Sequence, residues 1–94
     1  MRFMDDELRK RTEKEIEMMR KVFKAIQVKE DNNPISISFF DMASNYFSDC
    51  VFFFEKQDYI RAFEAVVISW SYVDAGIKAD FFTVTKDLKQ YFTS

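Results

Sequence analysis

The sequence predicts an all-α fold, an antiparallel three-helix bundle, and three observations favour it. Glycine and proline occur once each, whereas hairpin-rich sheets need glycine at the positive-φ positions of their turns. Apolar residues recur three or four positions apart through most of the chain, which is helical periodicity. One stretch clearly interrupts this pattern, so the helices are few and long. With 94 residues, the chain has the size of a single domain with one core, residues 1–94.

The first helix is predicted over about residues 5–27. Three acids, Asp5 to Glu7, stand at its start, where the helix dipole is positive and the backbone amides are unpaired. A loop is expected from Lys29 to Pro34, because Asn32-Asn33-Pro34 favours a turn and proline cannot donate a backbone hydrogen bond. The apolar stripe of this helix is Leu8, Ile16, Met19, Phe23 and Ile26.

The second helix is predicted over about residues 37–56. Ser36 or Ser38 can cap its first amides, and Asp41 follows Ser38 by three residues, as in a capping box. The helix is expected to end near Lys56. Its apolar stripe keeps spacings of three and four residues: Phe40, Ala43, Phe47, Val51 and Phe54.

The third helix is predicted over about residues 58–80, with Asp58 as its N-terminal cap. So few residues separate it from the second helix that the two must form a tight antiparallel hairpin. Thr85 is a candidate cap for a short closing helix over 86–92, and no strand is predicted. The apolar stripe alternates spacings of four and three: Tyr59, Phe63, Val66, Trp70, Val73 and Ile77.

A line of small residues lies beside this stripe, where Ala62, Ser69 and Gly76 recur every seven residues. Small side chains allow another backbone to approach closely. Gly76 inside a helix costs roughly 1 kcal/mol relative to alanine, which favours a packing reason for it. The alternative is that Gly76 lies at the C-terminal end of the helix.

Four segments, taken in order, give the chain a resemblance to a known family. They are Ala43-Ser-Asn-Tyr46-Phe-Ser-Asp49, Phe54-Glu-Lys-Gln-Asp58-Tyr59, Ala62-Phe63-Glu64-Ala65 and Asp74-Ala75-Gly76. Over about residues 40–82 the chain therefore resembles the archaeal domain-of-unknown-function family 357, whose pattern has tyrosine-x-x-aspartate, a glycine-aspartate turn and a closing leucine-aspartate-alanine-glycine. The resemblance implies a small helical bundle and carries no known activity.

The chain departs from the family pattern at two places. Gln57 replaces the turn glycine, and the segment from Ser69 to Val73 stands where the family tends to have alanine-histidine-glycine-tryptophan. A role that depends on that histidine therefore cannot operate here. The residues that mark the family or the fold are Tyr46, Asp49, Asp58, Asp74 and Gly76.

The composition excludes several kinds of functional site. Without histidine and with one cysteine, the chain can form no serine–histidine triad, histidine base, zinc finger or disulfide framework. We therefore expect no catalytic residue, no metal and no cofactor, and a protein that is not an enzyme. Fourteen Lys and Arg against sixteen Asp and Glu leave a net charge of −2, so general attraction to nucleic acid is not expected.

The chain also lacks the signals of a membrane or secreted protein. No apolar run approaches the roughly 18 residues of a membrane span, and Asp5 and Asp6 stand where a signal peptide needs apolar residues. We expect a cytoplasmic protein in which Cys50 stays reduced as a small buried hydrophobe. The line of Lys10, Lys14, Lys21 and Lys24 is interrupted by Glu17 and is expected to be a solvated helix face.

Asp49 and Asp74 lie among apolar residues and therefore suggest paired carboxylates. Hairpin geometry argues against a pair, because it places Asp49 level with Glu64 and Asp74 level with Phe39 or Phe40. The two carboxylates are then roughly 12–15 Å apart along the helix axis, too far for shared proton chemistry.

Structural roles are expected for both acids. Asp74 would accept hydrogen bonds from the amides around Ser38, at the start of the second helix. Asp49 would pair with a base of the first helix such as Lys14.

The chain has clusters of aromatic residues whose members cannot all lie in the core. Phe52, Phe53 and Phe54 are consecutive and span about 200° of a helix, so at least one faces outward, and Phe52 shares its side with polar residues. Phe81-Phe82 is a second apolar pair. Either the C-terminal segment folds back over these residues, or they form a dimer or partner surface.

The leading hypothesis is a non-enzymatic helical interaction module that self-associates, by default as a two-fold dimer, or binds a protein partner. The alternative is a small-ligand or nucleic-acid accessory domain. The candidate interface consists of Phe52, Ala62, Ser69, Phe81 and Phe82.

Overall fold

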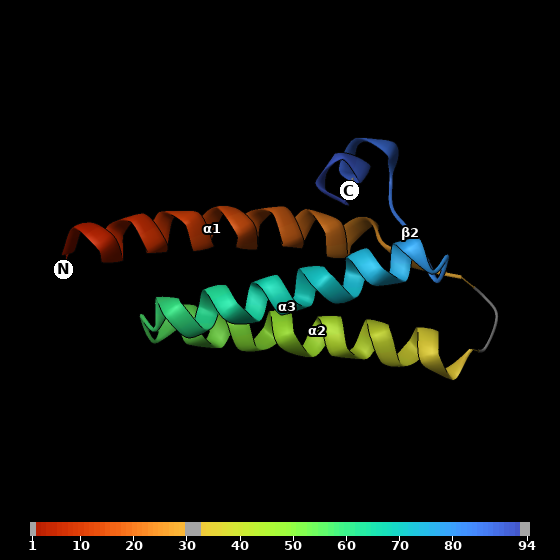
Figure 1. The fold of residues 1–94 in the computed structure, drawn as a ribbon, viewed down its shortest axis with the longest axis horizontal. Helices are drawn as coiled ribbons and strands as arrows, with labels where there is room; N and C mark the ends of the chain where they lie inside the picture. Colours follow the sequence, from red (N-terminus) through yellow and green to blue (C-terminus); the bar gives the residue numbers. More distant parts are fainter. Residues whose placement is uncertain (1, 30–32, 93–94) are drawn as a thin grey trace.

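The computed structural model describes the backbone of residues 2–29 and 33–92, and side chains from residue 6 onward within these ranges. Three α-helices run in alternating directions along the molecule, so that the first and third point the same way (Figure 1). The all-α prediction is confirmed. The elements are α1 (Arg2–Ala25), β1 (Gln27–Val28), α2 (Pro34–Glu55), α3 (Tyr59–Lys78), β2 (Phe82–Thr83) and the 3₁₀ helix η1 (Lys86–Phe92).

The helix starts show which capping predictions were right. Asp58 caps α3, because its side chain accepts a hydrogen bond from the Arg61 amide at 3.2 Å, as expected. The predicted start of α2 at Ser36 or Ser38 is wrong, since Asn33 is the cap and accepts from the Ile35 amide at 2.9 Å. Pro34 then occupies the first helical position, where a missing N–H removes no hydrogen bond. α1 begins at Arg2 rather than near residue 5.

A two-stranded antiparallel sheet joins the ends of α1 and α3, and the sequence did not predict it. Gln27 pairs with Thr83 and Val28 with Phe82. The Lys29 amide extends the pairing by donating to the Phe81 carbonyl at 2.9 Å. Each strand has two residues, too few to show the alternation that identifies a strand in a sequence. Of the expected loop, residues 30–32 lie outside the described part of the chain.

The core is built where the three helices meet and is closed by the C-terminal segment. Cys50 is fully buried, as predicted, and this burial raises the pKa of its thiol from its ordinary value of 9.0 to about 11, partly offset by the nearby charge of Arg20. The buried apolar residues include Met19 and Val22 of α1, Ala43 of α2, Val66 and Val73 of α3, and Leu88 and Phe92 of η1.

The small-residue line on α3 has the packing function that its spacing indicates. Ser69 donates a hydrogen bond from Oγ to the Ala43 carbonyl at 2.7 Å, so α2 comes close along this line. Gly76 lies inside α3, and a Cβ added there would be 2.2 Å from Cε2 of the Phe82 ring. The packing explanation for Gly76 is therefore correct, and the close neighbour is an aromatic ring.

Candidate interaction surface

Most of the residues predicted for an interface lie inside the fold. Ala62, Ser69 and Phe82 are at most 1% exposed, because α2 covers the small-residue line and Phe82 packs into the core. They offer no surface to a partner, which corrects the prediction for these three residues. Phe81 is half-buried, and its ring meets that of Phe39 edge-on at 5.5 Å between centroids.

Phe52 is exposed, as predicted, with 55% of its surface accessible. Its ring contacts that of Phe53 at 5.6 Å, and the Lys56 ammonium lies 5.5 Å from its centroid. The other exposed residues on this side of α2, such as Asn45 and Ser48, are polar. A single exposed aromatic side chain is common on protein surfaces, so the role of Phe52 in an interface stays a prediction.

The C-terminal segment covers part of α3, as the sequence allowed. The Phe92 ring stacks on Trp70 at 5.6 Å between centroids, and Trp70 donates from Nε1 to the Tyr91 carbonyl at 3.0 Å. Figure 1 shows this segment beside the second half of α1, and Tyr91 shares a surface hollow with Met18. The C-terminal segment therefore shields Trp70 from solvent and does not cover Phe52.

Asp74 has a partner other than the predicted one. Its carboxylate lies 2.6 Å from the Lys78 ammonium, one turn along α3, and its side chain is 18% exposed. It does not cap α2, because Asn33 provides that cap. Its ion pair lies within one helix, so the expected contact with the start of the second helix is absent.

Asp49 also differs from its expected role. It is exposed, and it lines a hollow between α2 and α3 together with Tyr46, Arg61 and Glu64, instead of facing Lys14 of α1. The prediction that Asp49 lies level with Glu64 along the hairpin is correct, since the two residues share this hollow. No ion pair of Asp49 is present among the described residues.

The solvent-exposed side of α1 is charged and the middle of α2 is mainly polar, although Ile35 and Ile37 near the start of α2 are 57% and 50% exposed. Between residues 10 and 24 of α1, every exposed residue is charged. The exposed residues in the middle of α2 are Asp41, Asn45, Ser48 and Asp49, followed by Phe52.

α3 exposes apolar residues along the helix, and a charged residue lies towards each end. Ile60, Val67 and Ile68 are 66%, 42% and 38% exposed, yet Glu64 is the one charged residue between positions 62 and 73. Figure 1 shows that no other element lies in front of α3 in this view. We call this surface the open face of α3 and define it as Ile60, Glu64, Val67, Ile68, Ser71 and Ala75.

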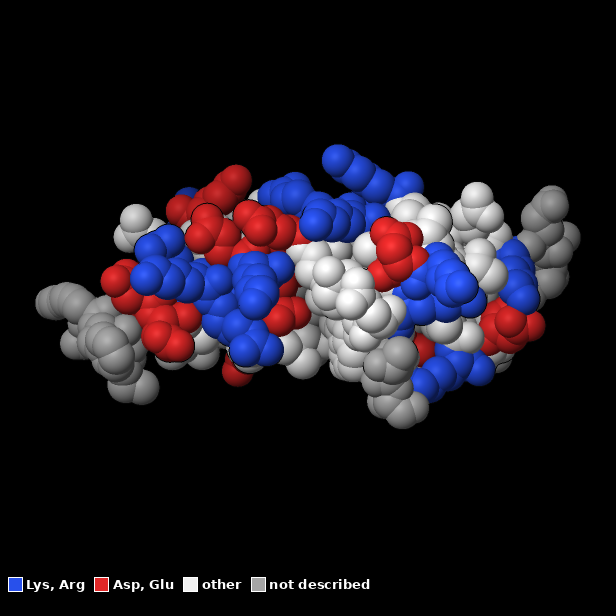
Figure 2. Space-filling view, turned by 90° about the horizontal axis from the view of Figure 1, so that it is seen from above, with Lys and Arg blue, Asp and Glu red and all other residues white. Residues whose placement is uncertain are grey.

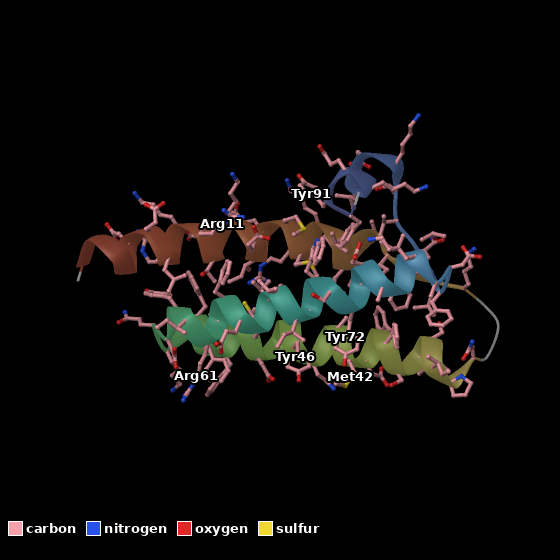
Figure 3. The ribbon with its side chains drawn as sticks, viewed as in Figure 1. Arg11, Met42, Tyr46, Arg61, Tyr72 and Tyr91 are labelled. Carbon is pink, nitrogen blue, oxygen red and sulfur yellow. The ribbon has the colours of Figure 1, made fainter. Side chains whose placement is uncertain are left out.

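A shallow hollow flanks the open face on each side. The hollow towards α2 holds about 180 Å³ and includes Tyr46, Phe53, Arg61 and Ile68. The hollow towards α1 holds about 120 Å³ and is lined by Arg11, Glu15, Phe63, Val67 and Trp70. Figure 3 shows Tyr46 and Arg61 on the side of the molecule away from α1, and Arg11 on α1 itself. The open face is thus a ridge with room for side chains of a partner on both flanks.

The sequence contained a signal for this face. A helix with one side in water normally has charged residues at every turn of that side, whereas the segment from Ala62 to Val73 has one. The regular stripe from Tyr59 to Ile77 drew attention to the buried side of the helix. The signal was the lack of charge on the opposite side.

Other kinds of site have less support in the described residues. The hollows described between the helices hold about 120 to 240 Å³, below the roughly 300–1,000 Å³ of typical small-molecule sites. In residues 2–29 and 33–92, no group of three or more Cys, Asp and Glu side chains is placed to hold a metal ion. Within the same ranges, no helix has the length and apolar character needed to cross a membrane.

The chain was compared with known proteins. A family model described as "Protein of unknown function (DUF357)" matches residues 9–82. The crystal structure of protein AF1782 from Archaeoglobus fulgidus, also assigned to DUF357, is similar to this fold with a TM-score of 0.74 and 32% sequence identity. The match covers 87% of this chain and 99% of that chain. A comparison with curated proteins gave no match.

Proposed function

The chain belongs to the DUF357 family of proteins of unknown function, and from that premise we propose that it is a non-enzymatic interaction module that binds protein through the open face of α3. In this proposal, an antiparallel three-helix bundle, closed by the C-terminal segment, presents the face in the cytoplasm. The observation that carries the proposal is the exposure of Ile60, Val67 and Ile68 along one side of a helix.

The physical reason is the free energy of burying apolar surface. Removing apolar area from water contributes about 25 cal/mol per Å², so each of Ile60, Val67 and Ile68 can supply about 1–2 kcal/mol in a well-packed contact. The core of a protein interface is poor in charged residues, and the middle of this face has Glu64 alone. The charged residues Arg61 and Lys78 lie towards its two ends, where an interface has its polar rim.

The experiment measures the mass of the assemblies that the full chain forms. Light scattering would be applied to the wild type, to Ile68→Arg and to Ser48→Arg. Any protein that co-purifies in stoichiometric amount would be kept in the sample and counted as part of the assembly. Ser48→Arg is the matched control, because it adds the same side chain to the polar exposed side of α2. We expect the wild type and Ser48→Arg to assemble and Ile68→Arg to remain a monomer with an unchanged circular dichroism spectrum. A wild-type monomer without a stoichiometric partner would contradict the proposal.

A second candidate function has one observation in its favour. Of the eight exposed residues between positions 10 and 24 of α1, six are Lys or Arg and two are Glu. Figure 2, which views the molecule from the α1 side, shows basic and acidic side chains interleaved, so the surface is not continuously basic. Nucleic-acid binding by this side would weaken steeply with salt and would be reduced by Lys14→Glu and Lys21→Glu. Ile68→Arg would leave it unchanged.

A further inference from the structure

We infer that the partner bound by the open face of α3 is a second copy of this chain, in antiparallel orientation, about a two-fold axis that passes between Val67 and Ile68. This inference rests on the proposed function and specifies its partner and geometry. It is argued from the length of the face and its flanking hollows, from the residues that the axis brings together and from the position of the one central charge.

A two-fold dimer can cover the open face together with its flanks. α3 has 20 residues and is therefore about 30 Å long, on a molecule whose longest dimension is 48 Å. A stable interface buries about 800 Å² on each partner, roughly an eighth of the 6398 Å² surface of this chain, so the contact has to include the hollows on both flanks as well as the open face. A two-fold contact uses the same face on both chains, so the open face of each chain is covered by that of the other.

The antiparallel register pairs residues of complementary size. With the axis between Val67 and Ile68, residues whose numbers lie equally far from it face each other at about 1.5 Å of rise per residue. Val67 then meets the partner's Ile68, and Ile60 meets the partner's Ala75. The large exposed side chain of Ile60 is thus opposite the smallest side chain of the face. Each of these contacts occurs twice because of the symmetry.

The charge of Glu64 selects the antiparallel orientation. In a parallel two-fold pair, Glu64 would face the partner's Glu64, and two like charges would be desolvated together. In the antiparallel pair, Glu64 faces the partner's Ser71. In the single chain the exposed Ser71 hydroxyl donates to the Val67 carbonyl of its own helix at 2.9 Å. In the dimer, rotation of the hydroxyl would exchange this hydrogen bond for one to the partner's Glu64 carboxylate, which is the stronger acceptor.

The charges near the ends of the face have partners within their own chain. Arg61 lies 3.5 Å from the Asp58 carboxylate, and Lys78 lies 2.6 Å from that of Asp74. No ion pair of Glu64 is present in the described part of the chain. Glu64 is therefore the charge of this face that a contact would desolvate without a partner from its own chain, and the antiparallel contact supplies a hydrogen-bond donor for it.

The first test locates the contact by sedimentation equilibrium of the full chain. We expect a wild-type dimer at micromolar concentration, a dissociation constant raised at least 100-fold by Ile68→Arg, and no change for Phe52→Arg. Phe52 is a matched control because it is another large exposed apolar residue, on α2. Dissociation by Phe52→Arg with none by Ile68→Arg would move the contact to α2 and overturn the inference.

The second test determines the orientation by changing the charge at Ser71. In the antiparallel dimer, Ser71→Lys places an opposite charge at Glu64 of each partner and should tighten association by roughly threefold to tenfold. Ser71→Glu should weaken it by a similar factor, and the double variant Glu64→Lys with Ser71→Glu should restore it. A parallel dimer would be weakened by both single substitutions, and the double variant would not recover.

The outcomes separate this inference from the proposed function. If the wild type is a monomer but forms a stoichiometric complex with another protein that Ile68→Arg abolishes, the proposed function stands and the inference is overturned. If the wild type is a monomer without any such complex, both are overturned. A dimer sensitive to Ile68→Arg, but weakened by Ser71→Lys, overturns the antiparallel register.

Discussion

At the scale of single residues, Gly76 is a position where the fold leaves no room for a side chain. A Cβ on Gly76 would lie 2.2 Å and 2.3 Å from two ring atoms of Phe82, and that ring is 1% exposed, so it cannot move away freely. Alanine gains about 1 kcal/mol over glycine in a helix, whereas overpacking costs about 1–3 kcal/mol. The contact distance is short enough for overpacking to exceed the gain.

We therefore predict that Gly76→Ala lowers the free energy of unfolding by about 1–2 kcal/mol, measured by urea denaturation. The control is the same substitution in a Phe82→Leu background, where the smaller side chain leaves room for the added methyl group. In that background Gly76→Ala should be neutral or stabilising. Equal destabilisation in both backgrounds would show that the Phe82 ring is not the cause.

The buried thiol of Cys50 predicts a dependence of stability on pH. Burial raises its pKa from 9.0 to about 11, so the folded state keeps the proton at a pH where the unfolded chain loses it. The stability from this group is fully present below pH 9 and is lost as the pH rises through 11, by up to about 2–3 kcal/mol.

The measurement compares the wild type with Cys50→Ala by urea denaturation at pH 8 and pH 10.5. All other ionisable groups are the same in both proteins, so their contributions cancel in the comparison. We expect the stability advantage of the wild type to shrink at the higher pH. An advantage that stays constant would mean that the Cys50 thiolate is solvated in the fold.

At the scale of elements, the sequence predicted helices with long periodic patterns well, but it did not predict features that depend on a single local contact. The stripes from Phe40 to Phe54 and from Tyr59 to Ile77 located two helices, because a helix averages its pattern over many residues. The cap at Asn33 was missed because Ser36 and Ser38 are equally good caps by residue type.

Backbone conformation was another feature that the sequence did not reveal. Gln57 has a φ of 63° in the turn between α2 and α3, which explains why the resembling family has glycine there. Asp80 has a φ of 68° in the turn after α3, and its side chain pairs with Lys29 at 2.6 Å. Neither residue type signals a positive φ on its own, since both occur far more often in ordinary helix or turn conformations.

The C-terminal segment gives a prediction about Trp70, the one tryptophan of the chain. Phe92→Ala removes the ring stacked on Trp70, so the tryptophan emission should shift to longer wavelength and the free energy of unfolding should fall by about 2–4 kcal/mol. Tyr91→Ala is the control, because its backbone carbonyl still accepts the Trp70 hydrogen bond and its ring is exposed. Equal spectral shifts in both variants would contradict this role of the stack.

At the scale of the whole molecule, the three helices present three different surfaces to water. α1 is charged, α2 is polar in its middle but exposes Ile35 and Ile37 near its start, and α3 exposes Ile60, Val67 and Ile68 along its length. The interaction surface predicted from the sequence included the exposed Phe52 and the half-buried Phe81, but also Ala62, Ser69 and Phe82, which the fold buries. Small residues mark a close contact without saying whether the neighbour belongs to the same chain. The assembled fold answers this, because it shows that α2 already occupies that line.

The most direct measurement of the central claim is disulfide trapping across the open face of α3. In a Cys50→Ala background, a chain with Glu64→Cys is mixed with a chain with Ser71→Cys under mild oxidation, and the products are identified by mass spectrometry. In the antiparallel dimer these two positions face each other, whereas identical positions lie about 10 Å apart, beyond disulfide reach. The account predicts mainly mixed disulfides. Disulfides between identical chains, or none at all, would contradict it.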